Sequence, residues 1–76
     1  MKKNARRERF ETVAARRVQK IIDFLDSLSN CANRANYEYT DDDIKKMFKA
    51  INDQLSITKS AFDQQISKEG KNSFKF

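Results

Sequence analysis

Two heptad runs of equal length, one in each half of the chain, constrain this sequence more than any other feature. The first run consists of Ala14, Val18, Ile21, Leu25, Leu28 and Ala32. The second run consists of Ile44, Phe48, Ile51, Leu55, Thr58 and Phe62. Steps of four and three residues give a period of 3.5, which is typical of α-helices that pack side by side with a left-handed crossing. The sequence therefore predicts an all-α fold, with two helices in an antiparallel hairpin.

The boundaries of the two helices follow from the residues that flank the runs. The first helix should end where side chains at the C-terminal end of the first run compete for backbone hydrogen bonds; these are Ser27, Ser29, Asn30 and Asn33. We expect the second helix to end before Gly70, which would take a C-terminal capping position. The prediction is a single helical-hairpin domain over residues 1–76, with a first helix over about 4–31, a turn over 32–40, a second helix over about 41–67 and a tail over 68–76.

The start of the second helix carries the clearest local signals. Thr40 stands at an N-cap position, and Asp43 three residues later can complete a capping box. Tyr39 before the cap and Ile44 after it can form a hydrophobic staple. The three consecutive aspartates at 41–43 place negative charge where the helix dipole favours it. Capping explains these aspartates with fewer assumptions than the alternative, a metal site.

The small size of the chain bears on its assembly. A chain of 76 residues is near the size at which one hydrophobic core is only marginally stable, and two helices alone form a thin apolar seam. Because a second hairpin could cover that seam, we expect a homodimer that forms a four-helix bundle.

The residue types exclude several classes of chemistry. The chain has no His and a single cysteine, Cys31, which excludes a Cys/His zinc site and a Cys–His nucleophile within one chain. We therefore expect no enzyme activity, no metal, no cofactor and no small-molecule substrate, and we expect Cys31 to be a small buried residue. No stretch of about 18 apolar residues suggests a membrane span, so the expected location is cytoplasmic and no membrane partner is predicted.

Positive charge is concentrated at the N-terminal end. The first twenty residues carry eight basic and two acidic side chains, while the rest of the chain is close to neutral. At 100° per residue, five of the cations fall within an arc of about 100° on the first helix. These five residues, called the basic ridge below, are Arg6, Arg9, Arg16, Arg17 and Lys20. Four are arginines, whose planar fork suits phosphate oxygens. The ridge predicts binding of phosphate or of an acidic partner; the alternative is a solvated face, paired with acids of the second helix.

The segment between the predicted helices is a second candidate site. Residues 30–39 contain three asparagines, an arginine and two tyrosines, which is an unusual density of hydrogen-bonding and aromatic groups for a turn. Tyr and Arg are the side chains most often found as anchors of interfaces. Arg34 and Tyr37 are therefore candidate partner-binding residues. The alternative is that the asparagines cap the helix and the tyrosines close the bundle.

Three short runs of residues carry a resemblance to known proteins. They are Arg-Arg-Val-Gln-Lys at 16–20, Asn-Cys-Ala-Asn-Arg at 30–34 and Tyr-Glu-Tyr-Thr at 37–40. With these runs, residues 9–55 resemble a group of short helical proteins found on mobile elements of Gram-positive bacteria. The predicted hairpin is also similar in architecture to Rop-type helical hairpins, plasmid-encoded dimeric four-helix bundles that bind RNA. The first resemblance implies a mobile-element context, and the second is a likeness of fold.

These observations favour a non-enzymatic small regulator that binds nucleic acid, DNA or RNA, or a nucleic-acid-binding protein through the basic ridge. One alternative is a mobile-element-encoded inhibitor of a host defence nuclease, similar to anti-CRISPR proteins. A purely protein-binding adaptor and a structural bundle without a ligand are the others.

Overall fold

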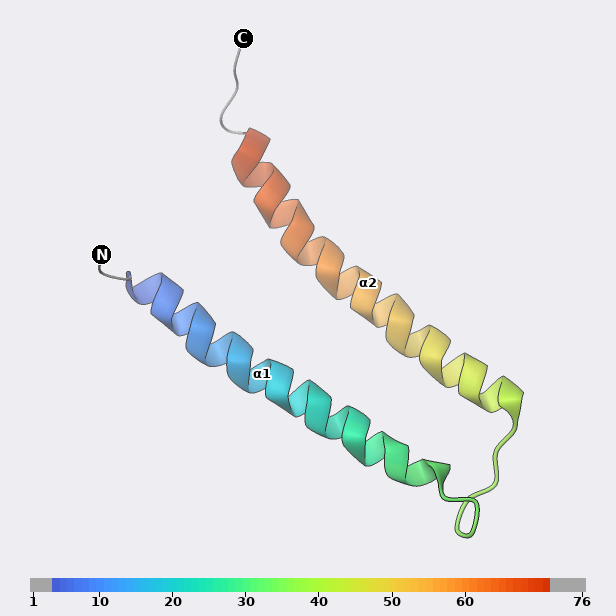
Figure 1. Cartoon of the computed structure of the whole chain (residues 1–76). Helices are drawn as coiled ribbons and strands as arrows, with labels where there is room; N and C mark the ends of the chain where they lie inside the picture. The colour runs from blue at the N-terminus through green and yellow to red at the C-terminus, as the bar shows by residue number, and fades with distance from the viewer. Residues whose placement is uncertain (1–3, 72–76) are drawn as a thin grey trace. The chain divides into compact units, whose positions relative to one another are not determined.

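The computed structural model describes the backbone of residues 4–71, and consists there of helices and turns with no strand (Figure 1). Helix α1 spans Ala5–Ser29, a single 3-10 turn η1 spans Asn30–Ala32, and helix α2 spans Asp41–Lys71. The all-α prediction is confirmed. The expected first helix over about 4–31 corresponds to α1 with η1.

The N-terminus of α1 is fixed by side chains of its first three turns. The Oδ1 atom of Asn4 accepts a hydrogen bond of 2.7 Å from the backbone N–H of Arg7, as an N-cap residue does. The guanidinium of Arg7 lies 3.3 Å from the carboxylate of Glu11 and 5.5 Å from the ring centroid of Phe10. Arg7 and Glu11 continue the four-and-three spacing of the first heptad run towards the N-terminus. The heptad positions of α1 are therefore occupied by polar residues in the first turns of the helix and by apolar residues after them.

The N-terminus of α2 has the capping box that the sequence predicts. The backbone N–H of Asp43 donates to Oγ1 of Thr40 at 3.2 Å, and the backbone N–H of Thr40 donates to Oδ2 of Asp43 at 2.9 Å. Tyr39 and Ile44 are both partly shielded from solvent, which is consistent with the predicted staple. Capping thus accounts for Asp43.

The C-terminus of α2 differs from the prediction. The helix does not end before Gly70 but continues through it to Lys71, and the backbone of Gly70 has a negative φ. Gly70 is therefore an interior residue of the last turn and not a left-handed C-cap. Residues 72–76, the rest of the predicted tail, lie outside the described residues.

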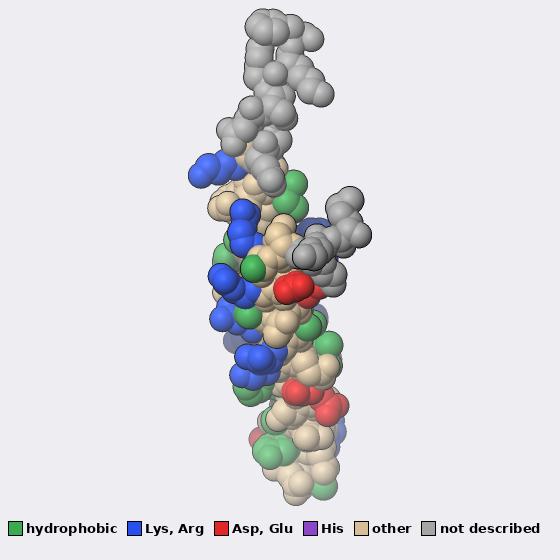
Figure 2. Space-filling view, turned by 90° about the vertical axis from the view of Figure 1, so that its left-hand side faces the viewer, with side chains coloured by type: hydrophobic (Ala, Val, Ile, Leu, Met, Phe, Trp, Pro, Cys, Tyr) green, Lys and Arg blue, Asp and Glu red, His purple; other side chains and the backbone are tan. Residues whose placement is uncertain are grey.

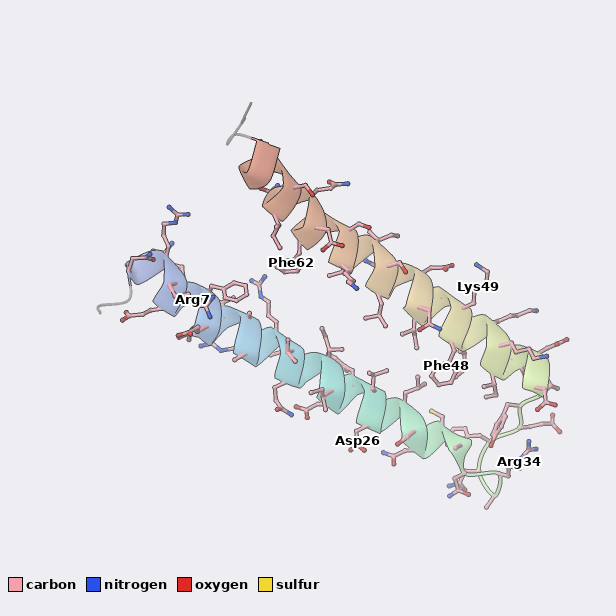
Figure 3. The ribbon with its side chains drawn as sticks, turned by 45° about the horizontal axis from the view of Figure 1, so that its top comes forward. Arg7, Asp26, Arg34, Phe48, Lys49 and Phe62 are labelled. Atoms are coloured by element: carbon pink, nitrogen blue, oxygen red, sulfur yellow. The ribbon has the colours of Figure 1, made fainter. Side chains whose placement is uncertain are left out.

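The chain divides into two compact units between Glu38 and Tyr39, with α1 and η1 in the first and α2 in the second. In α2, Phe48 and Phe62 project from one side of the helix and Lys49 projects from the opposite side (Figure 3). This separation is the amphipathic pattern that the second heptad run predicts.

The apolar faces of the two helices remain accessible. No residue whose exposure the structure describes is buried, and Leu25 and Phe48 of the heptad runs are 42% and 47% exposed. Figure 2 shows hydrophobic side chains that are accessible at the surface. Cys31 is exposed, so the expectation that it is buried is wrong. Cys31 lies in η1, and a small side chain there could be shielded only by a neighbouring element packed over the turn.

Candidate functional site

Helix α1 positions every residue of the basic ridge. All five residues fall within Ala5–Ser29, and all five are exposed. From Arg6 to Lys20 the ridge runs about 21 Å along the helix axis at 1.5 Å per residue. The regular backbone of α1 thus confirms that these cations share one side of a helix, as the 100° spacing predicts.

The residues of the basic ridge form no ion pair with an acid among residues 4–68. The ion pairs Arg7–Glu11 and Lys49–Asp53 use no residue of the ridge. Asp23 borders the ridge, and its Oδ1 atom accepts a hydrogen bond of 3.0 Å from Nε2 of Gln19 and not from a cation of the ridge. The side chains of the ridge therefore keep their hydrogen-bond donors for solvent or for a ligand. Such donors bind phosphate oxygens strongly because the bond is charge-assisted.

The turn after η1 holds the other two predicted site residues. Its backbone is organised by Asn33, whose Oδ1 atom accepts from Ala35 N–H at 2.9 Å and whose carbonyl accepts from Tyr37 N–H at 3.0 Å. Arg34 is exposed and Tyr37 is 52% exposed. Asn33 therefore plays the structural role that one interpretation of this segment expected, while Arg34 and Tyr37 are accessible from solvent (Figure 3 shows Arg34).

The structure does not bring the ridge and the turn together into one site. Helical backbone runs without a break from Ala5 to Ala32. Lys20, the last cation of the ridge, is therefore about 18 Å along the axis from the end of η1. A contact made by the turn and a contact made by the ridge are separable by mutation.

We expect Arg34→Ala and Tyr37→Ala to weaken partner binding more than Lys49→Ala does. Lys49 is the matched control because it is an exposed cation on α2 that already pairs with Asp53 at 2.8 Å. The measurement is the dissociation constant of each variant for the partner of the parent protein. Equal binding by the parent and the two turn variants would remove the turn from the candidate site.

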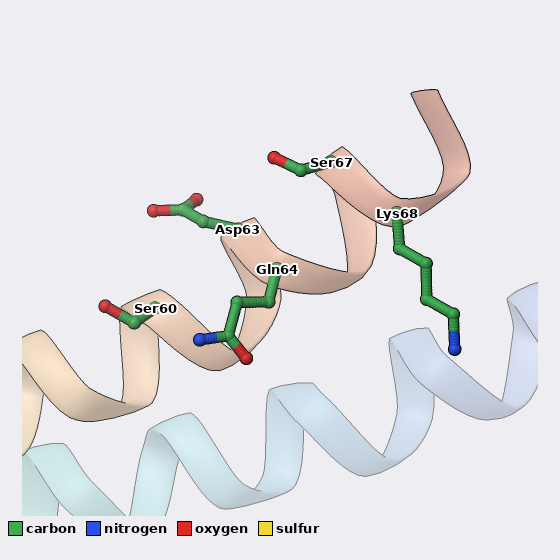
Figure 4. Close-up of a pocket in the computed structure, with 5 residues that line it drawn as sticks. All are labelled: Ser60, Asp63, Gln64, Ser67 and Lys68. Carbon is green, nitrogen blue, oxygen red and sulfur yellow. The ribbon is translucent and has the colours of Figure 1, made fainter. Parts of the chain in front are cut away.

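The side of α2 that bears Lys49 has the character of an ordinary solvent-exposed surface. Lys49 pairs with Asp53, and Nε2 of Gln54 donates to Oγ1 of Thr58 at 3.3 Å, both at i,i+4 spacing. A shallow hollow nearer the C-terminus is lined by Ser60, Asp63, Gln64, Ser67 and Lys68. In Figure 4, Ser60, Asp63 and Ser67 project to one side of a single helix, and Gln64 and Lys68 project below it. All five lining residues come from α2.

One residue of the ridge surface was missed by the sequence analysis. Phe24 lies between Lys20 and Arg17 in the helical projection of α1, one turn beyond Lys20. Its side chain is 74% exposed, the largest value among the exposed large hydrophobic residues that the structure describes. The signal was present in the sequence, because the projection that groups the five cations also places this aromatic ring among them.

Two further findings concern ligands and membranes. Among the described residues, no group of three or more His, Cys, Asp or Glu side chains is placed to hold a metal ion. Neither described α-helix combines the length and the apolar character needed to cross a membrane.

Comparisons with known proteins do not assign a family. No protein-family model, no curated protein and no solved structure matches the chain, so the resemblances to mobile-element proteins and to Rop-type hairpins remain predictions.

Proposed function

We propose that this protein is a small, non-enzymatic regulator that binds nucleic acid through the basic ridge of α1. The observation that carries the proposal is the ridge itself: five exposed cations on one side of a regular helix, none of them used in an ion pair with a described acid. A ridge of this kind attracts a phosphate backbone along its whole length.

The expected mode of binding is contact with phosphates. Arginine can hold two oxygens of one phosphate with its planar fork, and four of the five ridge residues are arginines. Such contacts position a protein on nucleic acid but carry little sequence information. We therefore propose binding with modest sequence preference.

Salt dependence tests this proposal. Neutralising phosphates releases counterions, so the logarithm of the association constant falls linearly with the logarithm of salt concentration, by about 0.7–0.9 per contacted phosphate. If all five cations make contacts, we expect a slope of about −3.5 to −4.5. The slope can be measured by fluorescence anisotropy, with labelled DNA and RNA oligonucleotides titrated with protein at several salt concentrations between about 50 and 300 mM.

No binding of DNA or RNA at the lowest salt concentration would remove the proposal. In that case, the alternative of a protein inhibitor would be favoured if the protein captured a defence nuclease from a host lysate from which nucleic acid had been removed by digestion. The ridge would then meet an acidic protein surface in place of a phosphate backbone.

We further propose that the two helices form an antiparallel hairpin and that two hairpins form a four-helix bundle. Two observations support this arrangement: the apolar faces of α1 and α2 are open to solvent, and their heptad runs have the same length. An antiparallel arrangement about the turn would place Leu25 opposite Phe48 and Ile21 opposite Ile51. The same register would place Glu11 opposite Phe62, so the layer nearest the open end of the hairpin would be partly polar.

A further inference from the structure

We infer that Phe24 is a stacking platform for an unpaired nucleobase, so that the ligand of the basic ridge is single-stranded nucleic acid. The inference rests on the proposed binding of nucleic acid by the ridge, and it names the class of nucleic acid. It starts from the position of one aromatic ring among cations on α1.

The placement of Phe24 follows from helix geometry. Phe24 projects in nearly the same direction as Arg6, which lies about five complete turns earlier in the same helix. Lys20 is about 6 Å and Arg17 about 10 Å from Phe24 along the axis. A nucleic-acid strand whose phosphates follow the cations towards the C-terminal end of the ridge would therefore reach Phe24 next. The base of the nucleotide at that point could turn towards the ring.

The exposure of the ring supports a role outside the hairpin seam. Phe24 is 74% exposed, whereas Leu25, the adjacent residue of the heptad run, is 42% exposed. Phe24 does not belong to the heptad run and lies on the flank of α1 that bears the ridge. The ring is therefore accessible to a ligand on the side of α1 that bears the cations.

The other aromatic ring near the ridge is already engaged. The Arg7 guanidinium lies 5.5 Å from the ring centroid of Phe10, at the edge of the heptad line. No such ring contact is made to Phe24 within the part of the chain that the structure describes. Of the two rings, Phe24 has its face available.

An unpaired base is the ligand that fits an exposed ring beside cations. Every base has a π-face, and stacking of bases on aromatic side chains combined with backbone contacts is the general mode of single-strand binding. In a duplex the faces of the bases are covered by their neighbours, so the ring could meet only groove edges or sugars. The ridge can contact the phosphates of a duplex or of a single strand, and Phe24 adds a contact that only an unpaired base can make.

The test compares single strands with duplexes for three proteins. We expect the parent to bind 12-nucleotide oligouridine or oligothymidine more tightly than a 12-base-pair duplex at equal salt, because stacking contributes only to the single strand. Phe24→Leu should weaken single-strand binding by about tenfold while leaving duplex binding and the salt slope unchanged. Phe24→Tyr should bind as the parent does. Leu keeps the hydrophobic volume but lacks a π-face, so loss of packing and loss of stacking give different results.

A direct spectroscopic readout is available because the chain contains no tryptophan. Phe24→Trp places the sole indole at the proposed platform, and its fluorescence should be quenched by the single strand and not by the duplex. Ile66→Trp is the control, since Ile66 is 67% exposed on α2. Comparing the binding of single-stranded RNA with that of single-stranded DNA shows whether the sugar contributes to affinity.

Two outcomes would overturn the inference while leaving the proposed function intact: unchanged single-strand binding by Phe24→Leu, or an equal loss for single strand and duplex. A change in oligomeric state of Phe24→Leu by light scattering would also overturn it, because the ring would then be part of the bundle. Failure of the parent to bind any nucleic acid would instead remove the proposed function and this inference with it.

Discussion

Replacing four residues of the basic ridge with Gln is expected to remove most of the nucleic-acid binding while leaving the helices intact. The substitutions are Arg9→Gln, Arg16→Gln, Arg17→Gln and Lys20→Gln. At about 0.7 kcal/mol for each exposed charged contact, the four changes would raise the dissociation constant by about 100-fold. Residual binding should show a salt slope that is flatter by about 3. Anisotropy titrations at several salt concentrations measure both effects.

The fold should tolerate these substitutions because the four side chains are exposed and form no ion pair with a described acid. Gln is also nearly as good a helix former as Arg and Lys. Far-UV circular dichroism should therefore be close to that of the parent. Unfolding of the variant would show that the ridge is structural, paired with acids of α2 or of a second chain.

A matched control separates position from net charge. The variant with Gln at Lys45, Lys46, Lys49 and Lys68 also loses four positive charges, lowering the formal net charge from +5 to +1, but only on α2. We expect it to bind nearly as the parent does. An equal loss of binding in the two variants would mean that attraction is diffuse, and unchanged binding by the ridge variant would move the site to Arg34 and Tyr37.

The features that the sequence predicts well are local ones. The capping box at Thr40 and Asp43 needs two residues three positions apart, and both of its hydrogen bonds form. The shared side of the ridge cations needs only a regular helix, which α1 provides. Neither feature depends on how distant parts of the chain pack.

The predictions that failed depend on less direct signals. Gly70 is permitted to adopt a left-handed cap but is not obliged to, and in a helix interior it costs only about 1 kcal/mol relative to Ala. A long helix such as α2 can absorb that cost, so it continues to Lys71. Burial of Cys31 requires another element to pack over η1, which no local pattern encodes. Phe24 was missed because a search for charge alone does not record the aromatic ring between the charges.

The two heptad runs lead to the second large effect: Leu25→Ala and Ile51→Ala are each expected to lower the free energy of unfolding by about 2–5 kcal/mol. Truncating a large side chain has this cost only where neighbouring atoms surround it, and each helix by itself leaves its seam open, with Leu25 42% exposed. The measured loss of unfolding free energy would therefore report how much packing the hairpin and the dimer provide around these side chains. For a chain of this size it corresponds to a decrease of about 8–40 °C in Tm.

Ile57→Ala makes the same chemical change on the same helix and is the natural control. Ile57 is 63% exposed and does not belong to the heptad run, so its truncation should cost less than about 1 kcal/mol. Thermal unfolding followed by circular dichroism at several protein concentrations compares the variants. If the bundle is dimeric, the Tm of the parent rises with concentration, because association stabilises the folded chain by mass action. Two results together would contradict the four-helix bundle: a monomer with full helicity at micromolar concentration, and equal losses of stability for Ile51→Ala and Ile57→Ala. If no second helix covers the apolar seam, truncating a residue on the seam costs no more than truncating a residue beside it.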